Sequence, residues 1–154
     1  MTPLTGDQFR IENLFSLRGK TALVTGGSSG LGLIMSRGLL RNGVKVLIAS
    51  RKSERCKLAL EELTPHGECY AFAADVTSMD DRKALLQEAE DKLGSISILI
   101  NNAGTNWAAK VEEYPDHGFA KVISTNLNAV FSLTRDALPS VSYTHLTLPT
   151  ILLV

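Results

Sequence analysis

Short apolar runs alternate with segments of helical periodicity along most of this chain, and no other sequence feature restricts the fold as strongly. Thr21–Thr25 is an apolar run that ends at paired glycines, and apolar residues at helical spacing follow it. Further β-rich runs occur at residues 44–49, 68–74 and 96–100. Strands that alternate with helices are joined by right-handed crossovers, so we predict an α/β fold with a parallel sheet covered on both faces.

The segments between these runs carry start and stop signals of helices. Gly43 should end the first helix, Ser53 should cap the second and Pro65 should end it. Ser78 and Asp81 have the spacing of a capping box and should open a third helix. The apolar residues that recur at helical spacing are Leu31, Ile34, Met35 and Leu39 in the first helix, and Cys56, Ala59, Leu60 and Leu63 in the second.

Composition and charge exclude several classes of function. Among the 154 residues, 16 Lys and Arg balance 16 Asp and Glu, which gives no reason to expect nucleic acid or an anionic membrane as a partner. No apolar run approaches the roughly 18 residues of a membrane span, and the N-terminus lacks the apolar core of a signal peptide. We therefore predict a cytoplasmic protein, with an organelle lumen as the alternative. Cys56 and Cys69 match no metal-binding spacing and should be reduced, buried thiols.

A glycine-rich turn lies between the first strand and the first helix, with glycines at positions 26, 30 and 32. Glycine suits this place because the turn is tight and its backbone must come close to a pyrophosphate, and the N–H groups of the next helix then face the anion. A Walker motif is excluded, since Lys-Ser/Thr does not follow the last glycine. The alternative is an ordinary loop, but the position between strand and helix favours a nucleotide-binding turn.

Two motifs resemble the N-terminal signatures of the short-chain dehydrogenase/reductase family. They are the T-G-x-x-x-G-x-G turn at Thr25–Gly32 and the N-N-A-G at Asn101–Gly104. Asp75 and Val76, after the third strand, resemble the pair that meets the adenine ring in this family. The resemblance implies the N-terminal part of a doubly wound Rossmann fold with strand order 3-2-1-4, the later strands missing. Together with two residues at the end of the second strand, the expected cofactor-binding residues are Gly26, Ser28, Ser29, Gly30, Leu31, Gly32, Ser50, Arg51, Asp75, Val76, Asn102, Ala103 and Gly104.

The end of the second strand indicates which nicotinamide cofactor would bind. A site that prefers NAD places Asp or Glu here, to accept hydrogen bonds from the ribose hydroxyls. This chain has Ser50 instead, followed by Arg51 and Lys52. A guanidinium matches the oxygens of a 2′-phosphate, which a carboxylate would repel. The two cations also fit a solvated turn, but the missing carboxylate points the same way, so we predict NADP(H).

A last helix should follow Pro115, and its inward face should carry Phe119, Val122, Ile123, Leu127 and Val130. Asn126 falls on the same face, where its amide must find hydrogen-bond partners. One interpretation is that Asn126 is an asparagine of the core whose hydrogen bonds are satisfied there. The other comes from the resemblance, because Thr125-Asn126-Leu127 is similar to the segment with the family's catalytic asparagine, which helps to hold the active-site lysine through a water.

The other catalytic residues of the family are absent from this chain. They are a serine and a Tyr-x-x-x-Lys pair, in which the tyrosine serves as general acid and base. Tyr143 is followed four residues later by Thr147, and Ser140 and Ser142 precede it too closely to match the family serine. The resemblance therefore implies that this chain alone is inactive.

The end of the chain resembles translated sequencing adapter. Residues 141–150 read back, codon by codon, as a transposon-end adapter, and the family resemblance stops near Pro139. A natural β-rich terminus is the alternative. We therefore divide the chain into an N-terminal arm (1–18), an NADP(H)-binding part (19–139) and a tail that is expected to be non-native (140–154).

Within the family, Asn101–Trp107 and Glu113–Pro115 are most similar to 3-oxoacyl-(acyl-carrier-protein) reductases of the rhamnolipid-biosynthesis type. This likeness implies a parent enzyme that reduces a 3-oxoacyl thioester or a similar carbonyl with NADPH, and that assembles as a dimer or tetramer. Gluconate and other sugar or polyol dehydrogenases share much of the pattern and remain an alternative. For this chain by itself, a catalytically silent nucleotide-binding fragment is the other interpretation.

Overall fold

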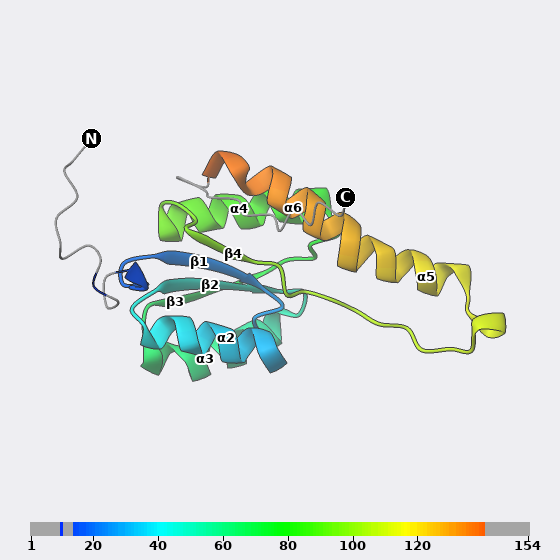
Figure 1. Cartoon of the computed structure of the whole chain (residues 1–154), viewed down its shortest axis with the longest axis horizontal. Coiled ribbons are helices and arrows are strands. Elements are labelled where there is room, and N and C mark those ends of the chain that lie inside the picture. Colours follow the sequence, from blue (N-terminus) through cyan, green and yellow to red (C-terminus); the bar gives the residue numbers. More distant parts are fainter. Residues whose placement is uncertain (1–9, 11–13, 141–154) are drawn as a thin grey trace.

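A four-stranded parallel sheet forms the centre of the molecule (Figure 1). The structure is a computed structural model that describes residue 10 and residues 14–140, so most of the predicted arm and tail lie outside the described residues. The strand order β3-β2-β1-β4 confirms the predicted order. The strands are β1 (Thr21–Thr25), β2 (Lys45–Ser50), β3 (Cys69–Ala73) and β4 (Ile98–Ile100).

Helices cover both faces of this sheet (Figure 1). One face carries α2 (Gly30–Arg41) and α3 (Ser53–Leu63), and the other carries α4 (Met79–Leu93) and α6 (Ala129–Ala137). The helix α5 (Asp116–Ile123) continues through a π-helical turn, Ser124–Asn128, into α6. Short 3-10 turns occupy Thr64–His66, Val111–Glu113 and Leu138–Ser140. Within the described residues, none of the helices has the length and apolarity that a membrane crossing needs.

Each face of the sheet has its own apolar core, because successive residues of a strand point to opposite faces. All five residues of β1 are buried. Leu23 of β1 faces α4 and α6, whereas Val24 faces α2 and α3. In register, Leu23 is level with Leu47 of β2 and with Leu99 of β4. The central strand is therefore held from both faces and from both edges.

The face of α2 that packs against the sheet does not carry all of its large apolar residues. Leu31 and Ile34 are 72% and 61% exposed, whereas Gly32, Ser36 and Leu40 are buried. Small residues let the helix approach the strand end: a Cβ on Gly32 would lie 2.3 Å from a carbonyl oxygen of the preceding turn. The Ser36 hydroxyl donates a hydrogen bond to the Gly32 carbonyl at 2.8 Å, so it is satisfied in the core.

The two predicted helix caps have different outcomes. Lys52 occupies the cap of α3, so the prediction that Ser53 caps this helix is wrong. The physical reason is that β2 extends to Ser50, which leaves Ser53 already inside the first helical turn. At α4 the prediction is confirmed, because the Ser78 hydroxyl accepts a hydrogen bond from the Asp81 N–H at 3.3 Å.

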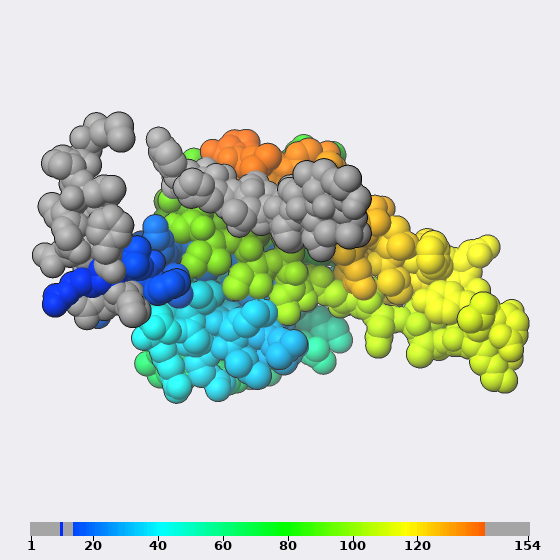
Figure 2. Space-filling model, in the orientation of Figure 1, coloured from blue at the N-terminus to red at the C-terminus, as the bar shows by residue number. Residues whose placement is uncertain are grey.

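The last helix also buries a different face from the predicted one. Phe119 and Leu127 are each 60% exposed and Asn126 is exposed, so the prediction that these three point inward is wrong. A π turn has i→i+5 hydrogen bonds and changes the phase of the side chains between α5 and α6. Small and apolar residues face the core instead, namely Gly118, Ala129, Leu133 and Ala137. Together with the segment before it, α5 projects beyond the sheet (Figures 1 and 2).

The buried face of α2 generates the first prediction. Leu40→Ala removes a side chain that is 3% exposed and should lower the free energy of unfolding by about 2–5 kcal/mol. Ile34→Ala, on the exposed face, should change it by no more than about 0.5 kcal/mol. Urea unfolding followed by circular dichroism measures both values. Equal losses for the two variants would show that α2 packs through its larger apolar residues after all.

Candidate functional site

A cavity of about 260 Å³ opens at the carboxyl ends of the strands. In open parallel sheets ligands bind at this edge, where neighbouring connections leave toward opposite faces. Here β1 leads into α2 on one face, and β4 leads toward α6 on the other. The cavity is lined by Gly26, Ser28, Ser29, Ala49, Ser50, Arg51, Arg55, Ala74, Asp75, Val76, Asn102, Ala103, Gly104 and Thr125.

The glycine-rich turn forms one wall of the cavity, and its shape depends on glycine. Gly26 has φ 66°, and a Cβ there would lie 2.8 Å from the Asn102 side-chain nitrogen. Gly32 leaves no room for a Cβ either, as its packing against the turn shows. Ser29 caps α2 without a side-chain hydrogen bond to the helix, so the first amides of α2 need another acceptor. These amides can bind an anion.

Thr25 and Asn102 join this turn to the segment after β4. The Thr25 hydroxyl is buried and accepts hydrogen bonds from the N–H groups of Asn102 and Ala103, both at 3.0 Å. The Asn102 side-chain amide donates to the carbonyls of Thr25 at 3.1 Å and Gly26 at 3.2 Å. Asn102 therefore fixes the glycine-rich turn from the opposite side of the cavity.

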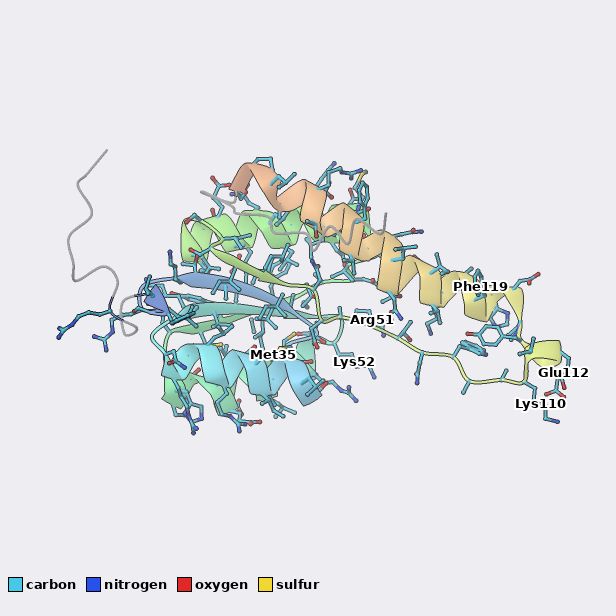
Figure 3. All side chains as sticks on the ribbon, in the orientation of Figure 1. Met35, Arg51, Lys52, Lys110, Glu112 and Phe119 are labelled. Atoms are coloured by element: carbon cyan, nitrogen blue, oxygen red, sulfur yellow. The ribbon has the colours of Figure 1, made fainter. Side chains whose placement is uncertain are left out.

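Arg51 and Arg55 form a positively charged wall of the cavity where β2 ends, which we call the cationic wall. Ser50, Arg51 and Arg55 line the cavity, whereas the neighbouring Lys52 does not (Figure 3 labels Arg51 and Lys52). Arg55 was missed by the sequence reasoning. The available signal was its position in the first turn of α3, four residues after Arg51, which turns its side chain back toward the strand end. Two guanidinium groups, not one, thus border this end of the cavity.

Asp75 supplies a carboxylate to the same cavity. Its Oδ1 accepts hydrogen bonds from the Thr77 N–H at 2.9 Å and from the Thr77 hydroxyl at 2.7 Å. Burial by itself would raise the pKa of Asp75, but these hydrogen bonds and the nearby Arg51 charge outweigh it and lower the pKa below the usual value. The group is ionised at neutral pH and faces the cationic wall.

Asn126 lies beside the cavity but does not line it. Its Oδ1 accepts a hydrogen bond from the Thr105 N–H at 2.9 Å, and its Nδ2 donates to the Thr105 carbonyl at 2.8 Å. These two contacts fix the backbone on both sides of Thr105, directly after Asn101–Gly104. The neighbouring Thr125 does line the cavity and was also missed by the sequence reasoning. The π-helical turn that carries both residues is a feature often found at functional sites.

Most of the predicted cofactor-binding residues meet in this cavity. Gly30, Leu31 and Gly32 do not line it; they form the first turn of α2, directly after Ser29, which does. Neither cysteine takes part. Both thiols are free, and burial raises the pKa of each, that of Cys69 to about 11, so neither is a thiolate at neutral pH. In the described part of the chain, no group of His, Cys, Asp and Glu has the composition of a metal site.

Comparisons with known proteins agree with this geometry. The family model of short chain dehydrogenases matches residues 20–145. A rhamnolipids biosynthesis 3-oxoacyl-(acyl-carrier-protein) reductase of Pseudomonas aeruginosa is 42% identical over 125 residues, which are 81% of this chain and 49% of that protein. The 5-keto-D-gluconate 5-reductase of Escherichia coli is 33% identical over 126 residues, 81% of this chain and 50% of that protein. The chain thus spans about half the length of the curated relatives it matches.

Solved structures show the same likeness. The RhlG/NADP active-site complex of Pseudomonas aeruginosa superposes with a TM-score of 0.78 at 41% identity, covering 82% of this chain and 49% of that one. An actinorhodin polyketide ketoreductase variant with NADPH gives a TM-score of 0.76 at 33% identity, covering 79% and 47%. With its parallel sheet in the order 3-2-1-4 and its glycine-rich turn closed by Asn102, this chain belongs to the short chain dehydrogenase family.

Proposed function

We propose that residues 19–139 form the NADP(H)-binding part of a short-chain oxidoreductase. The observation that carries this proposal is the wall at the end of β2, where Ser50 stands with Arg51 and Arg55 beside the cavity. A site for NAD would place a carboxylate at the position of Ser50. Two guanidinium groups instead suit a 2′-phosphate, which they can bind through charge-assisted hydrogen bonds. The relatives solved with NADP and NADPH support the same choice.

The remaining walls fit the other parts of this cofactor. Ser28 and Ser29 line the cavity and, together with the free first amides of α2, suit the pyrophosphate. Asp75 and Val76 suit the adenine ring, and Asn102–Gly104, which also line the cavity, would contact the nicotinamide half of the cofactor. When bound, the cofactor supplies the hydride of the reaction. The chain's own residues bind it and orient it.

For the whole protein we propose the reduction of a 3-oxoacyl thioester or a similar carbonyl. The support is the 42% identity to the 3-oxoacyl-(acyl-carrier-protein) reductase of Pseudomonas aeruginosa. A sugar or polyol dehydrogenase is the second candidate, favoured by the relative that acts on 5-keto-D-gluconate. Asn126 would contribute to either reaction as a positioning residue, since its amide fixes the Thr105 peptide next to the cavity.

The absence of the family's Tyr-x-x-x-Lys pair generates a prediction about turnover. The sequence contains no Tyr-x-x-x-Lys, so the 154-residue chain should bind NADPH but not oxidise it in the presence of an acetoacetyl thioester or 5-keto-D-gluconate. Loss of cooperating catalytic groups lowers rates by several orders of magnitude. The absorbance of NADPH at saturating substrate measures this directly. Turnover that persists through purification to homogeneity would mean that other residues of this chain supply the proton.

The cationic wall generates a prediction about cofactor choice. Arg51→Asp should weaken NADPH binding by about 2 kcal/mol or more, because it removes a charge-assisted contact and places a carboxylate against the 2′-phosphate. NADH, which lacks this phosphate, should lose much less. Calorimetric titration of both cofactors measures the difference.

Lys52→Asp is the matched control for this substitution. It makes the same change of charge one residue away, at a side chain that does not line the cavity. Its effect on NADPH should be small and should disappear at high salt, since exposed charges are screened. Equal losses for NADPH and NADH in Arg51→Asp would show that Arg51 does not bind the 2′-phosphate.

A further inference from the structure

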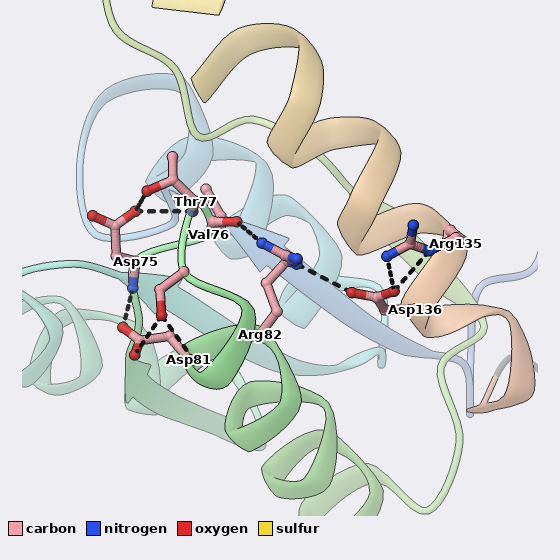
Figure 4. Close-up of polar contacts among 8 residues, drawn as sticks. Asp75, Val76, Thr77, Asp81, Arg82, Arg135 and Asp136 are labelled. Atoms are coloured by element: carbon pink, nitrogen blue, oxygen red, sulfur yellow. Dashed lines mark hydrogen bonds and ion pairs between the residues drawn. The ribbon is translucent and has the colours of Figure 1, made fainter. Parts of the chain in front are cut away.

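Arg82 is a buried cation outside the cavity, with 6% of its surface exposed. It lies in the first half of α4, and its side chain reaches two separate parts of the molecule (Figure 4). Its Nη1 donates to the Val76 carbonyl at 3.0 Å, and its Nε donates to Asp136 Oδ2 at 3.1 Å. A buried charge needs such partners, because an unpaired one costs several kcal/mol.

One end of this contact is the loop that forms the Asp75–Val76 wall of the cavity. The Asp75 N–H donates to Asp81 Oδ2 at 2.8 Å, and the Ser78 N–H donates to the Asp75 carbonyl at 2.9 Å. Asp81 and Arg82 are consecutive residues of α4, so its first turn holds the loop at two successive residues, Asp75 and Val76. Val76 is itself 8% exposed and lines the cavity.

The other end of the contact is α6. Asp136 also accepts hydrogen bonds from Arg135, at 3.0 Å from Nε and 2.7 Å from Nη2. Hydrogen bonds from Arg135 first of all, and then from Arg82, hold the pKa of Asp136 below its usual value against the effect of burial. The same continuous helix carries Thr125, which lines the cavity.

We propose that Arg82 is a positioning residue for cofactor binding, which joins the Asp75–Val76 wall of the cavity to α6 through Asp136. Removing its side chain frees the Val76 carbonyl and releases the loop from the helix that continues to Thr125. The wall then samples conformations that do not fit a cofactor, and binding must first select the competent one. The effect on cofactor binding rests on the proposed NADP(H) site. The effect of Arg82 on the order of the Asp75–Val76 loop does not.

Two measurements on the 154-residue chain test this role. Arg82→Met keeps a long side chain and removes both hydrogen bonds. In the chain without cofactor, amide exchange at Thr77 and Ser78 should become faster. In titrations, the Kd for NADPH should rise about tenfold, the factor that corresponds to about 1.4 kcal/mol. Arg82→Lys, which keeps the charge and can retain one contact, should lie between Arg82→Met and the wild type in both measurements.

Arg37→Met is the matched control. Arg37 pairs with Glu62 between α2 and α3, on the opposite face of the sheet, and neither residue lines the cavity. This variant should also be less stable, but its exchange at Thr77 and Ser78 and its Kd for NADPH should stay at wild-type values. If Arg82→Met fails to fold, the same two measurements are made on Asp136→Asn. This variant keeps the side-chain shape and weakens only the contacts to Arg82 and Arg135.

The outcomes separate the two proposals. If the wild-type chain binds NADPH, and Arg82→Met or Asp136→Asn loses stability with unchanged exchange and unchanged Kd, Arg82 is only a structural residue and the inference is overturned. If the wild-type chain does not bind NADPH, the proposed function fails and with it the link to the cofactor, whatever the exchange rates show. Faster exchange together with the higher Kd supports the positioning role.

Discussion

The hydroxyl of Thr25, at the end of the central strand, is the interaction on which the site depends. Thr25 is 1% exposed, and its hydroxyl accepts hydrogen bonds from two consecutive amides after β4 and donates one to the Ile100 carbonyl at 3.3 Å. Through it, the ends of β1 and β4 are held in one geometry. Asn102 can then reach the carbonyls of the glycine-rich turn, and that turn places Ser28 and Ser29 at the cavity, directly before α2.

The walls of the cavity around this contact differ in charge. Backbone amides and serines form its centre, guanidinium groups border the end of β2, and the Asp75 carboxylate lies in the loop after β3. Each wall is built on the carboxyl end of a strand, so the sheet sets the distances between them. Contacts behind the walls then fix the loops, as Asp81 and Arg82 do for Asp75 and Val76. A ligand with phosphate groups at two separated positions suits such a cavity.

The sequence predicted those parts of the structure that depend on neighbouring residues. The four strands, their order and the cap at Ser78 follow from local periodicity, local hydrogen bonding and the resemblance of two motifs. The buried face of the last helix was predicted wrongly, and the apolar residues at helical spacing in α2 do not mark its buried face. In α2, close packing against the turn selects Gly32 and Ser36 over larger side chains, and in the last helix a π turn shifts the phase. Neither effect is visible in a pattern that assumes regular helical spacing.

Those residues of the candidate site that belong to sequence motifs could be predicted, and the others could not. Ten of the thirteen predicted cofactor-binding residues line the cavity, because the motifs lie at strand ends and strand ends meet at one edge. Arg55 and Thr125 lie on helices that approach this edge only in three dimensions. The pairing of Arg82 with Asp136 joins residues 54 positions apart, and nothing in the local sequence at either one points to the other.

The most direct test of this account is the affinity for NADPH of Thr25→Val compared with Thr25→Ser. Valine has nearly the same shape as threonine but removes the oxygen that these two amides share. The Asn102 N–H keeps the Ile100 carbonyl at 3.1 Å, whereas the half-buried Ala103 N–H loses its acceptor, at a cost of about 1–3 kcal/mol. Serine keeps that oxygen. If the Thr25 hydroxyl holds the site together, Thr25→Val should bind NADPH at least about tenfold more weakly than the wild type, and Thr25→Ser should stay close to it. Wild-type affinity in a folded Thr25→Val chain would contradict the account.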